Sequence, residues 1–466
     1  MGPCECKKVT GSKQSKRKEH VFAMNGTRYT GTWESVKQHT VPAWYEDCKF
    51  GIFIHWGIYS VPAFAPRTWE LGEVDSDEQW FCNNPYAEWY YNSVNVGRGP
   101  TYEHHMNTYG REFRYEDFIP MWKAENWNPG EWAELFQKAG AQYVVLTAKH
   151  HDGFCLYPSE HTEFHVGRMG PCRDITGDLT EAVRGAGLKM GLYYSGLIDW
   201  QFANDPIFVE GENFSNACPT FEYADYSYKQ MKELVDKYRP SVLWNDIGWP
   251  KQSEHAMPYL LAHYYNTVED GVVNDRFNGL YHDFLTKEYQ YGKADRTQKW
   301  EMCRGMGLSF GYNENEGDDQ LISLPKLIRL LVATVADNGN LLLNIGPKAD
   351  GTIPTEQVKR LLTLGRWLQV NGKGIYGTRC SRRLSEHRAD GTQVYYTRKG
   401  RDLYFYIDGL KEGCNVVSLP GLHRTVTALN PALEVEQDVS ENGLRLTVKN
   451  YRSDLYLLGF EAAGQE

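Results

Sequence analysis

The feature that most constrains the fold of this chain is an alternation of apolar runs and amphipathic segments between residues 50 and 371. The clearest apolar runs are 50–55, 143–148, 190–194, 242–245 and 341–345, and the weaker candidates are 272–274 and 307–310. Continuous apolar runs of this length are typical of parallel strands covered on both faces. This part of the chain is therefore expected to form a parallel sheet wrapped by helices.

The segments between the runs have helical periodicity. Apolar residues recur at the spacing of one helix face in 228–238 and again in 324–335. Helix-ending residues follow several segments, at Gly140, Gly187, Pro240 and Gly339. Repeated strand–helix units predict a (β/α) barrel across residues 24–375, with a doubly wound sheet as the alternative.

Polar, functional-looking residues at or just after the ends of many successive predicted strands favour the barrel. They are His55, His150, Tyr193, Asp246, Arg276 and Glu288. A barrel collects functional groups around its whole rim, whereas an open sheet gathers them at one switch point. We therefore expect these side chains to meet at the carboxyl end of a barrel.

The character of the sequence changes after Gly377. Strand-like runs occur at 394–397, 403–407, 444–448 and 455–458, with turn dipeptides at 390–391 and 442–443. These patterns predict a small antiparallel β-domain over residues 376–466. No low-complexity linker separates it from the barrel, so we expect the two to pack directly together.

The first 23 residues differ from the rest of the chain. They are rich in Lys, Gly, Ser and Thr, and they predict a disordered leader or an expression remnant, with Met24 as the natural start. No apolar run follows Met1, which predicts a cytoplasmic protein without a signal peptide. No stretch approaches the roughly 20 apolar residues of a membrane helix.

Composition and motifs exclude several classes of function. A formal net charge of −10 argues against nucleic-acid binding, which needs clustered Lys and Arg. The ten cysteines form no Cys-x-x-Cys pair, so neither a structural zinc site nor a thioredoxin-type motif is indicated. The glycines of 305–311 do not have dinucleotide-loop spacing, and no nucleophile elbow or Walker sequence occurs.

The segment 243–250, Leu-Trp-Asn-Asp-Ile-Gly-Trp-Pro, carries the strongest chemical indication. Its carboxylate, Asp246, ends a predicted strand between two tryptophans, whose flat faces suit the C–H faces of a sugar. Glu288 follows forty-two residues later (288 minus 246). Two carboxylates on neighbouring strand ends would form the nucleophile and acid/base pair of a retaining glycosidase.

Other polar residues admit a ligand-binding or a structural interpretation. His150 and His151 are interpreted as sugar-binding residues, and metal ligation is the rival interpretation. Adjacent residues on a strand point to opposite faces, which makes ligation of one metal ion by both side chains awkward. Glu88 and Trp89 lie in a loop of the kind that carries specificity. Arg276 could keep Asp246 ionised by charge attraction, or it could form a plain salt bridge.

The chain resembles the α-L-fucosidases of glycoside hydrolase family 29. The matching segments are 50–60, 149–154, 191–200, 243–250, 273–276, 307–317 and 339–354. The resemblance implies an irregular (β/α)8-like TIM barrel followed by a C-terminal antiparallel β-sandwich. It also implies retaining hydrolysis of terminal α-L-fucosyl linkages of oligosaccharides or glycoconjugates, without metal or organic cofactor.

The resemblance also implies roles for individual residues. Asp246 falls on the family's nucleophile and Glu288 on its general acid/base, with Glu301 as the competitor for the second role. Sugar-contacting positions fall on His55, Glu88, Trp89, His150, His151, Tyr193, Trp244 and Arg276, and the ring that packs on the fucose methyl group falls on Phe310.

Two other functions and several properties stay open at this point. A catalytically inactive fucose-binding barrel would share the fold, and a metal-dependent barrel hydrolase would use His150 and His151. The sequence does not decide which fucosyl linkage is cleaved or whether the chain forms a homo-oligomer. Loops 69–92 and 202–219 are expected to set the linkage.

Overall fold

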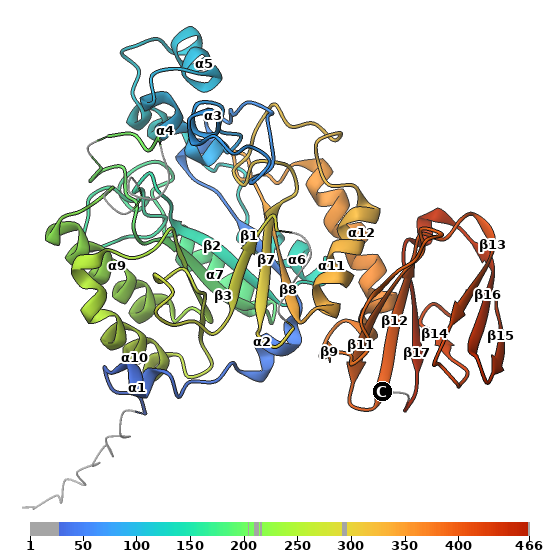
Figure 1. The fold of residues 1–466 in the computed structure, drawn as a ribbon. Helices are drawn as coiled ribbons and strands as arrows, with labels where there is room; N and C mark the ends of the chain where they lie inside the picture. Colours follow the sequence, from blue (N-terminus) through green and yellow to red (C-terminus); the bar gives the residue numbers. More distant parts are fainter. Residues whose placement is uncertain (1–27, 204, 209–213, 215–216, 291–295, 465–466) are drawn as a thin grey trace, which may run out of the picture.

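The structure is a computed structural model that describes residues 28–203, 205–208, 214, 217–290 and 296–464. The prediction of a leader over residues 1–23 lies outside the described residues, as does part of the loop 202–219. The described chain forms two units, a large strand–helix barrel and a smaller all-β domain (Figure 1).

The larger unit is built on a single sheet of eight parallel strands in the described residues. They are β1 Phe50–Ile54, β2 Tyr143–Lys149, β3 Lys189–Ser195, β4 Val242–Asp246, β5 Val272–Val273, β6 Leu285–Glu288, β7 Trp300–Gly305 and β8 Gly339–Ile345. Their order is β5-β4-β3-β2-β1-β8-β7-β6. An isolated parallel bridge between Asn274 and Phe284 joins the two ends of the sheet. The predicted irregular TIM-like barrel is confirmed.

Two details of the strand prediction were wrong. The weak candidate 307–310 is a loop, whereas β6 and β7 were missed. Charged residues such as Lys287 and Glu301 interrupt both strands, so neither has the continuous apolar run that indicates a buried strand.

Helices cover the outside of the barrel. Those that pack on its wall are α6 Pro129–Lys138, α7 Ile175–Gly185, α9 Phe221–Tyr238, α10 Met257–Thr267, α11 Leu324–Ala336 and α12 Thr355–Asn371. Short helices near the barrel ends are α1 Trp33–Val36, α2 Ala43–Cys48, α3 Asp77–Cys82, α4 Tyr90–Asn95 and α5 Pro100–Thr108. In Figure 1, α3, α4 and α5 lie beyond one end of the strands.

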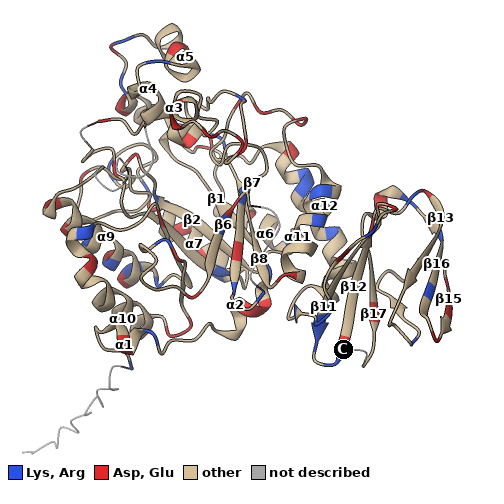
Figure 2. Cartoon of the chain, in the orientation of Figure 1, with Lys and Arg blue, Asp and Glu red and all other residues tan. Residues whose placement is uncertain are grey.

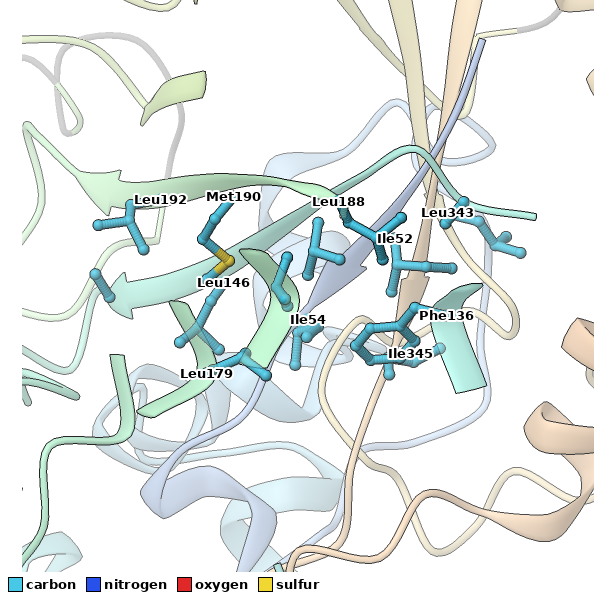
Figure 3. Packing of buried hydrophobic residues seen from close by; sticks show 14 of the residues in the cluster. Ile52, Ile54, Phe136, Leu146, Leu179, Leu188, Met190, Leu192, Leu343 and Ile345 are labelled. Carbon is cyan, nitrogen blue, oxygen red and sulfur yellow. The ribbon is translucent and has the colours of Figure 1, made fainter. Parts of the chain in front are cut away.

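The core is divided by the alternation of side chains along each strand. Outward-facing residues pack against the helices, and Figure 3 shows Ile52, Ile54, Leu146, Met190, Leu192, Leu343 and Ile345 beside Phe136 of α6 and Leu179 of α7. Inward-facing residues such as Phe53, Val145 and Leu342 form a second cluster inside the barrel. This inner cluster supports the floor of the cavity described below.

The smaller unit is a β-sandwich. Its strands are β9 Arg379–Cys380, β10 Glu386–His387, β11 Gln393–Lys399, β12 Asp402–Asp408, β13 Gly413–Leu419, β14 Thr427–Ala428, β15 Val435–Ser440, β16 Gly443–Tyr451 and β17 Leu458–Ala462. A sheet ordered β10-β11-β12-β17-β14, with β9 beside β11, faces the sheet β13-β16-β15 across its own apolar core. The last predicted strand, 455–458, was displaced, because β17 begins at Leu458 and residues 453–455 form a 3-10 turn.

The sandwich packs directly on the barrel, as the missing linker predicts. The Trp367 indole of α12 donates to the Leu457 carbonyl at 3.0 Å, and the Tyr406 hydroxyl donates to the Asn371 carbonyl at 2.7 Å. Tyr395, Tyr406 and Leu457 belong to the same apolar cluster as the barrel helices. The two units therefore share a continuous core.

Charges of both signs are interleaved on the surface. Acidic and basic segments lie close together on α9 in Figure 2, where Lys229–Asp225, Lys232–Asp236 and Lys237–Glu233 form i,i+4 ion pairs. Among the described residues, no helix combines the length and the apolar character needed to span a membrane.

Candidate active site

A cavity of about 140 Å³ opens at the carboxyl ends of the barrel strands. A cavity of about 150 Å³ accommodates one benzene ring, so this one is on the scale of one ring and not of a chain of sugars. Its wall contains all eleven residues predicted from the sequence, namely His55, Glu88, Trp89, His150, His151, Tyr193, Trp244, Asp246, Arg276, Glu288 and Phe310. The structure thus brings the predicted set together, and the roles of its members stay predictions.

Asp246 is the last residue of β4. Its Oδ2 accepts a hydrogen bond from the Tyr193 hydroxyl at 2.6 Å, and its Oδ1 accepts from the Ile247 amide at 2.8 Å and from Arg276 Nη1. Ile247 and Gly248 both have positive φ, 64° and 134°, so the chain turns sharply after the carboxylate. A β-branched residue rarely adopts this conformation, and such strain is typical of functional sites.

The electrostatic surroundings keep Asp246 ionised. Burial alone would raise its pKa, but the Arg276 charge and the hydrogen bonds from Tyr193 and Arg276 together hold the pKa below its ordinary value. An anionic oxygen at the edge of a sugar-sized cavity is suited to nucleophilic attack.

Glu288 ends β6 on the other side of the same guanidinium. Its Oε2 accepts from Arg276 Nη2 at 2.7 Å, and its Oε1 accepts from the Tyr86 hydroxyl at 3.1 Å. Arg276 therefore contacts both carboxylates, and its guanidinium carbon lies 4.9 Å from the centre of the Trp244 ring. Asp246 and Glu288 face one cavity, as the sequence predicted.

His55 follows β1 and is held in one tautomer. Asn344 donates its Nδ2 to the Phe310 carbonyl at 2.6 Å, so its Oδ1 accepts from His55 Nδ1 at 2.7 Å. Burial lowers the pKa of His55 to about 4, which keeps the ring neutral. Its Nε2 is consequently left as an acceptor for a ligand hydroxyl.

His151 is fixed in the same way. The Ser195 hydroxyl donates to the Ile198 carbonyl at 2.6 Å and thus accepts from His151 Nδ1 at 2.7 Å. Burial lowers the pKa of His151 to about 3, and its unprotonated Nε2 lies 3.9 Å from Asp246 Oδ2. A sugar hydroxyl is the kind of donor that two such adjacent acceptors require.

His150 completes the histidine group. Its ring lies nearly parallel to that of Tyr193, with centroids 5.7 Å apart, and its Nδ1 is buried without a partner among the described residues. Burial, together with His151 and His55, holds its pKa well below the ordinary value. The neutral ring of His150 lines the cavity and can exchange one hydrogen bond with a ligand.

Glu88 and Trp89 enter the cavity from a 3-10 turn, Ala87–Trp89. Glu88 Oε2 accepts from the Gly311 amide at 2.7 Å and from the Ser309 hydroxyl at 3.3 Å. Burial raises the pKa of Glu88 to about 7. These bonds tie the turn to the loop that presents Phe310, so a polar group and an apolar ring are positioned together.

Glu301 lies below the cavity and not in its wall. Its Oε2 accepts from the hydroxyls of Tyr45 and Tyr143 at 2.8 and 2.5 Å, and its Oε1 accepts from the Trp244 indole at 2.9 Å. The side chain is fully buried inside the barrel. The geometry therefore gives Glu301 a supporting position beneath Trp244.

Sequence reasoning missed part of the cavity wall. The additional residues are Phe53, Leu71, Trp80, Phe81, Tyr86, Phe214, Ile247 and Cys303. Several of them lie in the loops 69–92 and 202–219, which were expected to carry specificity. Their aromatic residues could have been named, but the sequence contains many rings and nothing in it shows which ones reach the cavity.

The donor groups bear on the metal alternative. Among the described residues, no group of three or more His, Cys, Asp or Glu side chains is arranged to hold a metal ion. His150 and His151 have adjacent rings with centroids 4.0 Å apart, and both contribute to the wall of the cavity. Their arrangement fits hydrogen bonding to a ligand.

A barrel whose strand ends carry two carboxylates in an aromatic, one-ring cavity has the architecture of a glycoside hydrolase. The family profile described as "Alpha-L-fucosidase" matches residues 18–373. The chain is 38% identical over 364 residues to an α-L-fucosidase of Dictyostelium discoideum, covering 75% of each chain. It is 37% identical to the human plasma α-L-fucosidase over 402 residues, covering 84% of this chain and 80% of the relative.

Comparison with solved structures points to the same family. A Thermotoga maritima α-L-fucosynthase in complex with α-L-Fuc-(1-2)-β-L-Fuc-N3 superposes with a TM-score of 0.86 at 46% identity, covering 94% of this chain and all of that one. The T. maritima α-fucosidase in complex with fucose gives a TM-score of 0.83 at 45% identity, with the same coverage. The chain belongs to the α-L-fucosidase family, glycoside hydrolase family 29, and has α-L-fucosidase activity.

Proposed function

We propose that this enzyme releases terminal α-L-fucose from fucosylated oligosaccharides or glycoconjugates with retention, by double displacement. The observation that carries the proposal is that Asp246 and Glu288 line one cavity and contact one guanidinium. Retention needs two carboxyl groups on opposite sides of one anomeric centre, close enough for direct attack. A binding barrel without activity would not need the second carboxyl group.

In the first step, a carboxylate oxygen of Asp246 attacks the anomeric carbon. The bond from that carbon to the glycosidic oxygen breaks, and the departing oxygen takes the proton of Glu288. In the second step, ionised Glu288 removes a proton from water, and the resulting hydroxide displaces Asp246 from the anomeric carbon. The proposed nucleophile is supported by the lowered pKa of Asp246.

The remaining residues of the predicted set are proposed to hold the sugar. The unprotonated nitrogens of His55 and His151 accept hydrogen bonds from sugar hydroxyls, and His150 and Glu88 supply further polar contacts. The rings of Trp89, Tyr193, Trp244 and Phe310 cover apolar faces, with Phe310 against the methyl group. The fucose complex of the T. maritima relative supports a monosaccharide in this cavity.

Replacing each carboxylate tests the assignment. Asp246→Gly should lower kcat by more than a hundredfold, because the covalent step has no nucleophile. Glu288→Ala should retain turnover of an activated aryl fucoside, and azide should accelerate that turnover and give fucosyl azide of retained configuration. The measurements are aryl fucoside kinetics and proton NMR of the first product anomer.

Three outcomes would contradict the proposal. If kcat of Asp246→Gly stayed within about tenfold of the wild-type value, only ~1.4 kcal/mol of transition-state stabilisation would be lost, and Asp246 would not be the nucleophile. Azide rescue of Glu301→Ala instead of Glu288→Ala would move the acid/base role to Glu301. Loss of wild-type activity with a chelator would favour the metal-dependent alternative.

A further inference from the structure

Tyr86 contacts the proposed acid/base directly. Its hydroxyl donates to Glu288 Oε1 at 3.1 Å, while Arg276 Nη2 donates to Oε2 at 2.7 Å. Each oxygen of the carboxyl group therefore has its own partner. The two partners differ chemically, since a guanidinium is a donor only, whereas a phenol hydroxyl both donates and accepts.

The ring of Tyr86 is held rigidly. Trp80 and Phe310 pack on it in edge-to-face geometry, each with a centroid separation of 5.5 Å and interplanar angles of 90° and 88°. The Tyr86 amide donates to Asn84 Oδ1 at 2.8 Å, which fixes the backbone before the Ala87–Trp89 turn. A hydroxyl on a ring clamped from two sides has little freedom to move away from Glu288.

The contacts determine which oxygen carries the catalytic proton. Arg276 is positively charged and only donates, so it favours negative charge on Oε2 and disfavours a proton there, whereas a proton on Oε1 is compatible with the Tyr86 hydroxyl, which both donates and accepts. We propose that Tyr86 is a positioning residue that holds Oε1 of Glu288 as the proton-carrying oxygen and directs it toward the departing glycosidic oxygen. This inference rests on the proposed acid/base role of Glu288.

The hydroxyl serves both half-reactions without losing its own proton. Burial, and then the charge of Glu288, hold the pKa of Tyr86 well above its ordinary value, so the phenol stays protonated. When Oε1 gives its proton to the departing oxygen, the Tyr86 hydroxyl donates to the new anion. When Oε1 takes a proton from water, the same hydroxyl remains as a partner for the neutral acid.

Tyr86→Phe tests the proposal, because it keeps the ring and removes the hydroxyl. The probes are two α-L-fucosides, a chloronitrophenyl fucoside, whose departing oxygen needs little protonation, and methyl fucoside, whose oxygen needs much. General acid catalysis contributes about 10²–10⁴-fold, so loss of its alignment should reduce kcat/KM for methyl fucoside at least tenfold more than for the aryl fucoside.

Tyr193→Phe is the matched comparison, because the Tyr193 hydroxyl contacts the other carboxylate, Asp246, at 2.6 Å. It should slow both substrates to a similar extent, since nucleophilic attack occurs with either leaving group. Trp80→Leu removes the edge-to-face contact on the Tyr86 ring but keeps the Tyr86 hydroxyl. It should give a smaller selective loss of kcat/KM for methyl fucoside.

An equal loss on both substrates in Tyr86→Phe, or no loss on either, would overturn the inference. Glu288→Ala measured alongside separates the two hypotheses. If Glu288→Ala shows the selective loss and Tyr86→Phe does not, the inference fails and the proposed function stands. If Glu288→Ala shows no selectivity, the acid/base assignment itself fails.

Discussion

At the scale of single residues, Glu288 and Glu301 differ in how deep they lie in the barrel, and this depth decides which of them reaches the cavity. Glu288 and Glu301 both point inward, but Glu288 is paired with Cys303 in the sheet register, so Glu301 lies two residues deeper. Two residues along a strand correspond to about 6–7 Å. Glu288 thereby reaches the cavity, and Glu301 meets Tyr45, Tyr143 and Trp244 beneath it.

Buried carboxyl groups also make stability depend on pH. Burial raises the pKa of Glu316 from its ordinary 4.5 to about 7, and its Oε1 accepts the amides of Leu308 and Ser309 at 3.0 and 2.9 Å. Between these pH values the unfolded chain releases the proton and the folded chain keeps it. The contribution of Glu316 is therefore fully present below pH 4.5 and is lost as the pH rises through about 7.

Glu316→Gln should remove this loss, because an amide oxygen can accept both bonds and cannot ionise. Relative to the wild type, the variant should gain up to about 2 kcal/mol in unfolding free energy between pH 4.5 and 7, after screening by solvent. Urea unfolding at pH 4.5, 6 and 8 measures the difference. A constant difference across this range would contradict the assignment.

At the scale of elements, the barrel closes through one residue. The two-residue strand β5 ends at Val273, and the next residue, Asn274, pairs with Phe284 through its backbone. Its side chain accepts from the Asn245 amide at 3.0 Å and donates to the Asn245 carbonyl at 2.8 Å. Asn274 thus continues the β4–β5 pairing directly beside Asp246.

Asn274→Ala should weaken the pairing of β4 with β5 at this closure. It leaves the amide and carbonyl of Asn245 without partners, which should cost about 2–4 kcal/mol of unfolding free energy, and it should lower kcat because Asp246 loses its support. Chemical denaturation and aryl fucoside kinetics check the two effects. The matched comparison is Asn278→Ala, which removes equivalent part-buried bonds to the Trp249 amide and carbonyl. Because the Asn278 side chain itself is exposed and water can replace it, this variant should cost less, about 1–2 kcal/mol.

At the scale of the whole molecule, the sandwich protects the outer face of the barrel. A Cβ added at Gly374 would lie 2.5 Å from the Tyr406 hydroxyl and 2.9 Å from Tyr404 Cβ, which shows how closely the two units approach. The ion pair between Arg329 of α11 and Asp408 of β12 lies at the same interface. We infer that the two units unfold together.

Calorimetry of the full chain should accordingly give a single transition. A chain that ends at residue 375 should aggregate, because it exposes the α12 surface that Tyr406 and Leu457 cover. Size-exclusion chromatography of the truncated chain detects this. A monodisperse, folded truncation with unchanged melting temperature would show that the barrel is independent of the sandwich.

The sequence by itself determined the barrel and the chemistry at its rim. Apolar runs such as 143–148 indicate strands that are buried on both faces, and the segment 243–250 places a carboxylate between aromatic residues. These are local properties of the chain, and a local pattern is sufficient to record them.

The tertiary structure alone decided which side chains share the cavity and how each is held. β6 and β7 are too polar to be recognised as strands, yet they place Glu288 at the rim and Glu301 below it. The contact of Tyr86 with Glu288 spans 202 residues, and that of Tyr45 with Glu301 spans 256. Closure of the barrel creates such contacts between distant segments, so no window of sequence contains them.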